Sequence, residues 1–305
     1  MRIEPRIIGR RDFPSSLVSA EGIGTIFADE SRRAVNVTFG VEYSVKSGMP
    51  LHLTILEPRL EDGEEAAFPL VVFVQGSAWF KQELHQNLGQ LVPYAASGLV
   101  IAMVEYRPSP LAPFPAQVKD ARTATGFMLA NAARYHIDPN RLILWGDSSG
   151  GHTVAMIAAT EGLEEFADEA AGPLPIRGVV DYYGPNLLAT MNEEPSIQDH
   201  DAPNSPEGML LGGVRVSEHP ERVAKASPLS YIESSRPLPP FLIMHGDKDR
   251  LVPFGQSVLL FKKLKDCGHR VEMYRLVDAD HGGRAFWTSK EACEATRDFL
   301  RRCLA

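Results

Sequence analysis

Cysteine is scarce in this chain of 305 residues. The three cysteines, Cys267, Cys293 and Cys303, all lie near the C-terminal end. An odd number of clustered cysteines does not suit a disulfide framework, so we expect three free thiols. Free thiols are the rule in reducing compartments, which argues against a disulfide-stabilised secreted domain.

Long apolar runs and an excess of positive charge are also missing. No apolar run approaches the length of a membrane-spanning helix, and residues 1–6 lack the apolar segment of a signal peptide. The formal net charge of −8 argues against nucleic acid or an anionic membrane surface as the main partner. These absences predict a soluble cytoplasmic protein with no nucleic acid and no membrane as partner. We also expect no cofactor and no metal ion.

Short apolar runs, in contrast, recur along the chain. They are continuous, as in strands buried on both faces of a sheet, and they occupy residues 70–74, 99–104, 142–145, 179–183 and 241–244. Helical stretches such as residues 116–135 separate them. Because strands that alternate with helices form parallel sheets, the predicted fold class is α/β, a mainly parallel twisted sheet with helices on both faces.

The ends and the middle of the chain depart from this pattern. Residues 35–45 and 51–56 alternate apolar and polar side chains around a turn, which predicts an antiparallel hairpin at one edge of the sheet. Residues 1–33 carry little pattern and are expected to form an N-terminal arm or cap. Residues 186–235, rich in Pro, Glu, Asn and Ser, form either a lid or pocket wall or a plain surface excursion. The whole chain, residues 1–305, is predicted to be a single domain.

The strongest local signal is Gly-Asp-Ser-Ser-Gly at residues 146–150, which follows an apolar strand and precedes an apolar helical stretch. It matches the pattern G-x-S-x-G, in which a strained turn lifts a serine above the sheet. Gly146 and Gly150 flank Ser148 because a Cβ at either position would collide where strand and helix cross. The pattern predicts Ser148 as a nucleophile; the alternative is a serine that merely caps the helix.

Polar residues also follow the next two predicted strands. The loop after the strand 241–244 holds Asp247 and Asp249, and the loop after the strand 271–277 ends in His281. Ligands of open parallel sheets bind outside the carboxyl ends of the strands. A serine hydroxyl needs a base within hydrogen-bond reach, which His281 would supply. Either aspartate would then orient the imidazole.

Other histidines are weaker candidates for the base. His269 precedes its strand and therefore lies at the wrong end of the sheet. His245 is expected in a tight turn with a structural role. His152 lies within the helix that follows Ser148 and is expected to form local hydrogen bonds.

Several motifs occur in one order along the chain: Phe73-Val74-Gln75-Gly76-Ser77-Ala78-Trp79, Tyr106-Arg107-Pro108, Phe114-Pro115-Ala116, the serine motif, His245-Gly246-Asp247-Lys248-Asp249 and His281-Gly282. Together with the chain order Ser, Asp, His they resemble the esterases of the α/β-hydrolase superfamily. The nearest branch is close to hormone-sensitive lipase and includes bacterial feruloyl-esterase-like and acetyl-esterase-like proteins. The resemblance covers roughly residues 35–303. It implies an α/β-hydrolase fold with a small lid and favours Asp249 over Asp247 as the catalytic acid.

The same resemblance implies an oxyanion hole. The branch usually has His-Gly-Gly-Gly before the tryptophan, whereas this chain has Gln75 at the histidine position and Gly76-Ser77-Ala78 after it. The family motif places the backbone donors at Gly76, Ser77 and Ser149, and the hydroxyl of Ser77 is a possible further donor. Trp79 either lines the substrate pocket or packs against neighbouring helices.

The sequence therefore predicts a serine carboxylesterase that acts on a small-molecule ester with a short acyl group or a compact aromatic acid. One alternative is a serine aminopeptidase of the prolyl-peptidase type, although most of these carry a large additional domain. The other is a non-catalytic small-molecule-binding protein on a hydrolase scaffold. Such proteins typically lose a member of the triad, whereas all three roles can be filled here.

Overall fold

The computed structural model describes residues 4–28, 31–61, 63–167 and 172–305. The chain forms two units, Met1–Arg32 and Arg33–Ala305. The described part of the first unit contains one short 3-10 helix, η1 (Arg10–Asp12). The predicted arm, residues 1–33, falls mostly on this unit, with its first three residues and residues 29–30 outside the described part. Its role stays a prediction.

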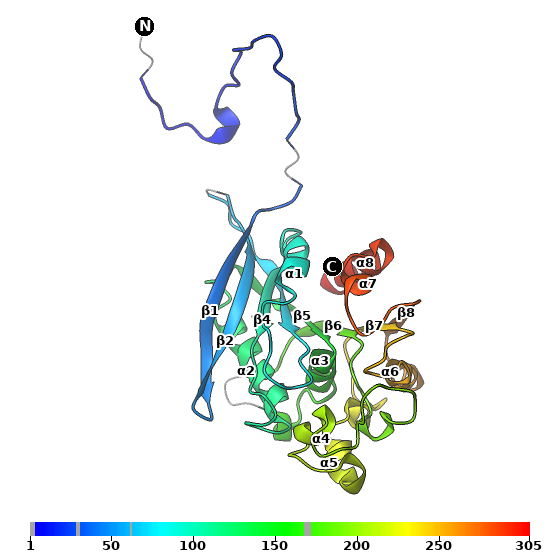
Figure 1. Cartoon of the computed structure of the whole chain (residues 1–305). Coiled ribbons are helices and arrows are strands. Elements are labelled where there is room, and N and C mark those ends of the chain that lie inside the picture. The colour runs from blue at the N-terminus through cyan, green and yellow to red at the C-terminus, as the bar shows by residue number, and fades with distance from the viewer. Residues whose placement is uncertain (1–3, 29–30, 62, 168–171) are drawn as a thin grey trace. The chain divides into compact units, whose positions relative to one another are not determined.

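The second unit is built on one sheet of eight strands in the order β1-β2-β4-β3-β5-β6-β7-β8 (Figure 1). The strands are β1 (Val35–Lys46), β2 (Met49–Pro58), β3 (Phe68–Val74), β4 (Val100–Val104), β5 (Ile137–Asp147), β6 (Ile176–Tyr182), β7 (Phe241–Gly246) and β8 (Val271–Leu276). The pairs β1–β2 and β2–β4 are antiparallel, and all later neighbours are parallel. The predicted edge hairpin and mainly parallel sheet are confirmed.

Two apolar cores lie on opposite faces of this sheet. Successive residues of β3 alternate between them, so that Leu70 and Val72 belong to one core and Val71 and Phe73 to the other. This alternation follows from the period of two along a strand. The first core is covered by α2 (Ala116–Ala130), α3 (Ser149–Ala159) and α6 (Gly255–Asp266), and the second by α1 (Leu88–Ala95), α7 (Arg284–Trp287) and α8 (Lys290–Leu304). Helices on both faces are therefore confirmed.

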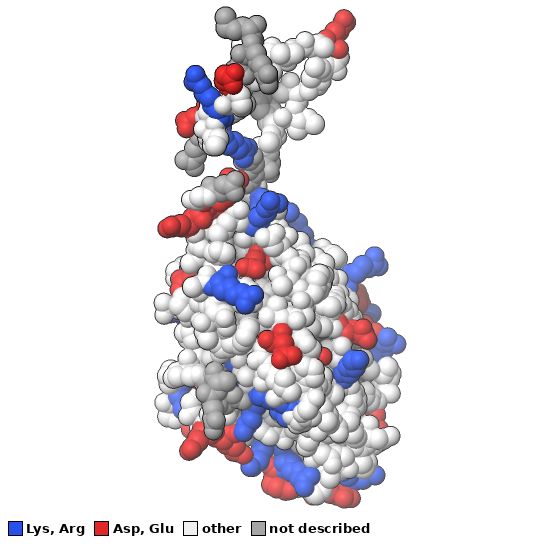
Figure 2. Space-filling view, turned by 90° about the vertical axis from the view of Figure 1, so that its left-hand side faces the viewer, with Lys and Arg blue, Asp and Glu red and all other residues white. Residues whose placement is uncertain are grey.

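Helix α2 ends at Ala130, earlier than the predicted residue 135. Asn131 closes the helix, because its backbone leaves the helical region and both its backbone N–H and its side-chain amide donate to the carbonyl of Phe127, at 3.1 Å and 2.8 Å. The three cysteines are free, as predicted. Acidic and basic side chains are interspersed on the face that carries β1 (Figure 2).

The segment 186–235 is folded and connects β6 to β7. It contains α4 (Pro206–Leu210), α5 (Pro220–Lys225) and short 3-10 turns. Ser205 caps α4 by accepting a hydrogen bond from the N–H of Gly208. Apolar side chains of segment 186–235 form a third cluster around Trp79. They are Leu188, Leu210, Leu211, Val216, Val223 and Ala226. In Figure 1, α4 and α5 lie beyond one end of the strands, away from α1 and α8.

Candidate active site

Ser148 lies at the tip of a sharp turn between β5 and α3, with φ 53° and ψ −127°. Few L-residues adopt this conformation, and here it turns the chain directly from strand into helix. A Cβ added at Gly146 would meet the backbone of Gly150, and one added at Gly150 would meet the backbone of Val74. Gly146 is therefore required where β5 and α3 cross, and Gly150 is required where α3 passes the end of the neighbouring strand β3. Gly151 has a different neighbour, because its Cβ would meet the carboxylate of Asp181 in β6.

The structure brings together the three side chains predicted to act in catalysis. His281 Nε2 lies 2.9 Å from Ser148 Oγ, and His281 Nδ1 lies 2.7 Å from Asp249 Oδ2. They come from the loops after β5, β7 and β8, whose carboxyl ends meet at one edge of the sheet. With the proton on Nδ1, the imidazole donates to Asp249 and its free Nε2 can accept the serine proton.

Asp249 is fully buried and makes four hydrogen bonds. Its Oδ1 accepts the backbone N–H groups of Leu251 and Val252, each at 2.9 Å. Its Oδ2 accepts from His281 and, at 3.1 Å, from His245 Nε2. Burial alone would raise the pKa of Asp249, but the bonds from the two histidines outweigh it and hold that pKa well below its usual range. The carboxylate is therefore ionised at neutral pH.

Asp247, the other candidate acid, has a different role. Its Oδ1 accepts the N–H of Asp278 at 2.8 Å, so it joins its own loop to the loop that carries His281. A second bridge joins the same loops, because Arg250 Nε donates to Asp280 Oδ2 at 2.7 Å. The geometry thus places Asp249, and not Asp247, beside the imidazole.

The predicted oxyanion donors differ in their availability. The N–H of Gly76 donates to Asp147 Oδ1 at 3.0 Å, and the N–H of Ser77 donates to Ser149 Oγ at 2.9 Å. The hydroxyl of Ser77 donates to the carbonyl of Phe80 at 2.7 Å. In this structure the buried carboxylate of Asp147 therefore takes the N–H of Gly76, and the carbonyl of Phe80 takes the hydroxyl of Ser77, so the oxyanion roles expected of these two groups stay predictions.

Some backbone N–H groups near the nucleophile have no acceptor in the part of the chain that the structure describes, and two of them matter for the oxyanion hole. One belongs to Ser149, the first residue of α3, where helix geometry leaves the N–H unused. The other belongs to Ala78, which has φ 54° and follows Ser77 in the same loop. Ser149 was predicted as a donor and Ala78 was not.

Trp79 is buried and packed against its neighbours, which is the second of the two alternatives predicted for it, and its role in substrate binding stays a prediction. Its side chain is 1% exposed and packs in the cluster formed by segment 186–235. Its indole N–H donates to His152 Nδ1 at 3.2 Å, and His152 Nε2 donates to the carbonyl of Ala226 at 2.7 Å. Burial lowers the pKa of His152 from 6.5 to about 4, so its imidazole is neutral. The hydrogen bonds predicted to be local instead join three elements.

Three residues that the sequence analysis did not assign to the site also contact it. Tyr183 packs its ring against His281 with 4.8 Å between centroids and donates its hydroxyl to Asp147 Oδ2 at 3.2 Å. Burial raises the pKa of Asp147, while the bonds from Gly76 and Tyr183 oppose the rise. Tyr183 directly follows β6, so the rule that site residues follow strands could have found it. His245 lies in β7 rather than in a turn and contacts Asp249.

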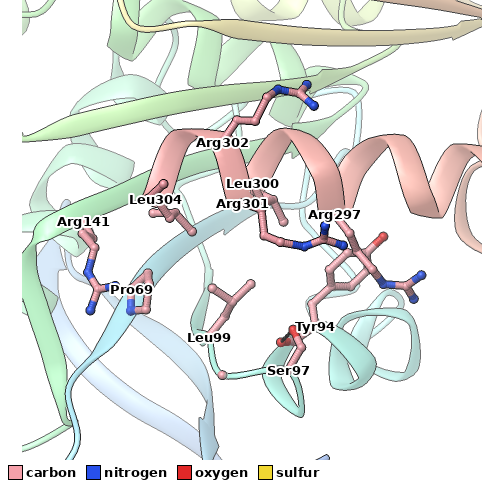
Figure 3. A pocket seen from close by; sticks show the side chains of 12 residues that line it. Pro69, Tyr94, Ser97, Leu99, Arg141, Arg297, Leu300, Arg301, Arg302 and Leu304 are labelled. Carbon is pink, nitrogen blue, oxygen red and sulfur yellow. Dashed lines mark hydrogen bonds between the residues drawn. The ribbon is translucent and has the colours of Figure 1, made fainter.

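Two hollows lie away from this site. One of about 740 Å³ lies between α8 and the beginnings of β3 and β4, with Leu99 and Leu300 pointing into it from opposite sides (Figure 3). The other, of about 470 Å³, lies within segment 186–235 and is lined by Leu187, His200 and Val223 among others. Neither lining includes a member of the predicted triad.

Two further searches cover the residues that the structure describes. No helix among them has the length and apolar character needed to cross a bilayer. No group of three or more His, Cys, Asp or Glu side chains among them is arranged to hold a metal ion.

Comparison with curated proteins finds esterases. Esterase LipQ of Mycobacterium tuberculosis is 28% identical over 256 residues, which cover 80% of this chain and 57% of that protein. Isoprenylcysteine alpha-carbonyl methylesterase ICME of Arabidopsis thaliana is 26% identical over 240 residues, covering 72% of this chain and 51% of that protein. The chain thus spans little more than half the length of these relatives.

Comparison with solved structures finds the same fold. A truncated form of a carbohydrate esterase from gut microbiota has a TM-score of 0.76 and 26% identity, covering 91% of this chain and 99% of that one. Esterase B of Lactobacillus rhamnosis has a TM-score of 0.72 and 18% identity, covering 88% and 85%, which is a likeness of fold. The BD-FAE family matches residues 56–264, more than half of the chain. The chain therefore has the α/β-hydrolase fold and belongs to the BD-FAE family.

Proposed function

We propose that this protein is a serine hydrolase that cleaves carboxylic esters through an acyl-enzyme intermediate. The observation that carries the proposal is the continuous hydrogen-bonded series from Ser148 through His281 to the buried carboxylate of Asp249. Membership of the BD-FAE family and the similarity to named esterases support ester hydrolysis as the reaction.

The proposed reaction has two halves. Ser148 Oγ attacks the ester carbonyl while its proton passes to His281 Nε2, and the ester bond then breaks as the imidazolium returns that proton to the departing alcohol. A water molecule next gives a proton to His281 and attacks the acyl-serine, which releases the acid and restores the hydroxyl of Ser148. Asp249 stabilises the imidazolium in both halves without taking its proton.

The negative oxygen formed in each half needs donors that the protein does not already use. The N–H groups of Ser149 and Ala78 meet this condition, whereas that of Gly76 is held by Asp147. The N–H of Ser77 serves only if it leaves the hydroxyl of Ser149. We therefore place Ser149 and Ala78 first among the donors and keep Ser77 as the third.

For the substrate, we propose a small ester with a short acyl group or a compact aromatic acid. The solved structure with 26% identity is named a carbohydrate esterase, which supports an acylated sugar as the alcohol part. A bulky Trp79 pointing into the pocket would have narrowed the acyl site, but Trp79 is buried, so this argument for a short acyl group does not hold. The apolar side chains of segment 186–235 are used in its own cluster, which supports a short acyl site instead.

The proposal is tested with p-nitrophenyl esters and aminoacyl-p-nitroanilides. We expect turnover of the esters alone. The variant Ser148→Ala should lose about six orders of magnitude in kcat and should no longer react with a fluorophosphonate probe. Turnover of the anilides would instead indicate a peptidase, and labelling of Ser148→Ala at the wild-type rate would contradict Ser148 as nucleophile.

A further inference from the structure

A second histidine contacts the carboxylate that His281 uses. His245 belongs to β7 and is completely buried. Its Nε2 lies 3.1 Å from Asp249 Oδ2 and 3.0 Å from the carbonyl oxygen of Val252. Its Nδ1 lies 2.7 Å from the hydroxyl of Ser257 in α6. A buried imidazole with partners on both nitrogens has one fixed orientation.

These partners determine where the proton of His245 lies. Nε2 faces two acceptors, a carboxylate and a carbonyl, so it must carry a hydrogen. Nδ1 faces the hydroxyl of Ser257, which can donate to it. The ring can therefore stay neutral and still donate to Asp249. A neutral donor orients the carboxylate without cancelling its charge.

Asp249 Oδ2 thus accepts from two imidazoles, one that faces the nucleophile and one that does not. We propose that His245 is a positioning residue, which holds Oδ2 in line with His281 Nδ1 and limits the negative charge that this oxygen offers to His281. This inference rests on the proposed function of the site. Leu251 and Val252 hold only Oδ1, so the carboxylate could still rotate if His245 were removed.

Other titratable groups face the same pair of imidazoles. Asp181 in β6 interacts electrostatically with His245, and Asp147 interacts with His281. Tyr183 lies between them, with ring centroids 6.4 Å from His245 and 4.8 Å from His281. Arg250 also interacts electrostatically with Asp249, but its guanidinium is hydrogen-bonded to Asp280. None of these groups donates a hydrogen bond to Asp249 Oδ2, which leaves His245 as the distinctive contact to vary.

The test compares His245→Asn with His245→Gln in p-nitrophenyl acetate hydrolysis across pH. Asparagine is too short to reach Asp249, whereas the amide nitrogen of glutamine can occupy the place of Nε2. We expect His245→Asn to lose about tenfold in kcat, the size of a lost hydrogen bond to a charged group, with KM within about twofold. The acid limb of its kcat/KM profile should move to higher pH, because Asp249 then stabilises the imidazolium of His281 more strongly.

Glutamine should restore both kcat and the position of the acid limb. The matched control is His269→Asn, since His269 bonds the carbonyl of Glu233 away from the site and should behave as wild type. An acid limb that does not move in His245→Asn would overturn the inference, even if kcat falls, because a merely structural role lowers activity without shifting the limb. If His245→Asn does not fold, a shifted limb in His245→Gln would overturn it.

The same series separates this inference from the proposed function. Wild type and Ser148→Ala are measured beside the histidine variants. Equal ester turnover by these two proteins would contradict the proposed function, and with it the role proposed for His245. Activity lost in Ser148→Ala but unchanged in His245→Asn would remove only the role of His245.

Discussion

Asp247 and Asp249 are two positions apart, but they have entirely different partners. Asp249 accepts from His281 and three other donors, whereas Asp247 accepts the N–H of Asp278. Of the two aspartates, only Asp249 contacts the imidazole of His281. The two aspartates can therefore be separated by the same conservative substitution.

We expect Asp249→Asn to lower kcat by about four orders of magnitude, as loss of the triad carboxylate does in serine proteases. The amide would favour the wrong tautomer of His281. Asp247→Asn keeps an oxygen for the N–H of Asp278 and should stay within about tenfold of wild type. Steady-state kinetics with p-nitrophenyl acetate measures both, and a larger loss in Asp247→Asn would reverse the assignment.

At the residue scale, local constraints could be predicted and distant partners could not. Gly146 could be predicted because the collision that it avoids, with the backbone of Gly150, involves the local crossing of β5 and α3. The N–H of Gly76, in contrast, is taken by Asp147, which is 71 positions away. No residue pattern specifies that contact, because it depends on how β3 and β5 pair.

At the scale of elements, hydrogen bonds link the oxyanion loop, α3 and segment 186–235. Trp79 on the loop donates to His152 on α3, and His152 donates to Ala226 in the segment. The T-shaped packing of the Trp79 and His152 rings, at 5.1 Å between centroids, adds to this connection. The connection suggests that Trp79 stabilises the fold rather than selects the substrate.

We therefore expect Trp79→Phe to reduce the free energy of unfolding by about 1 kcal/mol, through the lost indole hydrogen bond, and to leave the acyl-chain preference unchanged. Trp79→Ala should reduce that free energy by about 3–5 kcal/mol, as for other buried aromatic residues. Urea unfolding and a p-nitrophenyl ester series provide the two readouts. A shift of Trp79→Phe toward longer acyl chains would instead show that Trp79 bounds the acyl site.

The neutral imidazole of His152 also makes the connection sensitive to acid. The unfolded chain takes up a proton at His152 near its ordinary pKa of 6.5, whereas the folded protein resists until the pH reaches about 4. Stability is therefore lost as the pH falls from about 6.5 to about 4. The loss from this residue is on the order of 3 kcal/mol.

Urea unfolding at pH 7.5 and pH 4 isolates this contribution when wild type is compared with His152→Gln. Glutamine cannot be protonated in this range but can donate to the carbonyl of Ala226. We expect the stability difference between the two proteins to shift in favour of the variant on acidification. A difference that stays constant with pH would mean that His152 is not held neutral in the fold.

The sequence predicted the strands better than it predicted segment 186–235. Continuous apolar runs fix the strands because both faces of the sheet are covered, as for Leu70 to Val74 in β3. The short helices α4 and α5 have no long apolar period of their own. They are stabilised by packing around Trp79, a residue far away in sequence. The choice between a lid and a plain surface excursion could not be made from composition for this reason.

At the scale of the whole molecule, the proposed substrate is an ester with a short acyl chain. Apolar side chains of segment 186–235 pack against Trp79, and the two hollows described are not lined by Ser148, Asp249 or His281. In an apolar tunnel each methylene that fits would contribute about 0.8 kcal/mol, so kcat/KM would climb steadily with chain length. Such a climb is not expected here.

We expect kcat/KM on p-nitrophenyl esters to be largest at acyl chains of about two to four carbons and to fall steeply by about eight, because longer chains would leave apolar surface exposed to water. The control is Ser148→Ala, which corrects for uncatalysed hydrolysis of the shorter esters. Preference for the decanoate over the acetate and butyrate would indicate a lipase-like enzyme with a long acyl site.

Segment 186–235 leaves the sheet after β6 and returns at β7, and these strands are direct neighbours. The sheet therefore sets no limit on the length of the connection, and evolution can exchange it while the eight strands persist. A replacement segment must nevertheless cover the indole of Trp79 and provide a carbonyl that accepts the hydrogen bond of His152. We therefore expect homologues with a different segment between β6 and β7 to carry substitutions at positions 79 and 152 as well. These three distant stretches of the sequence should then vary together.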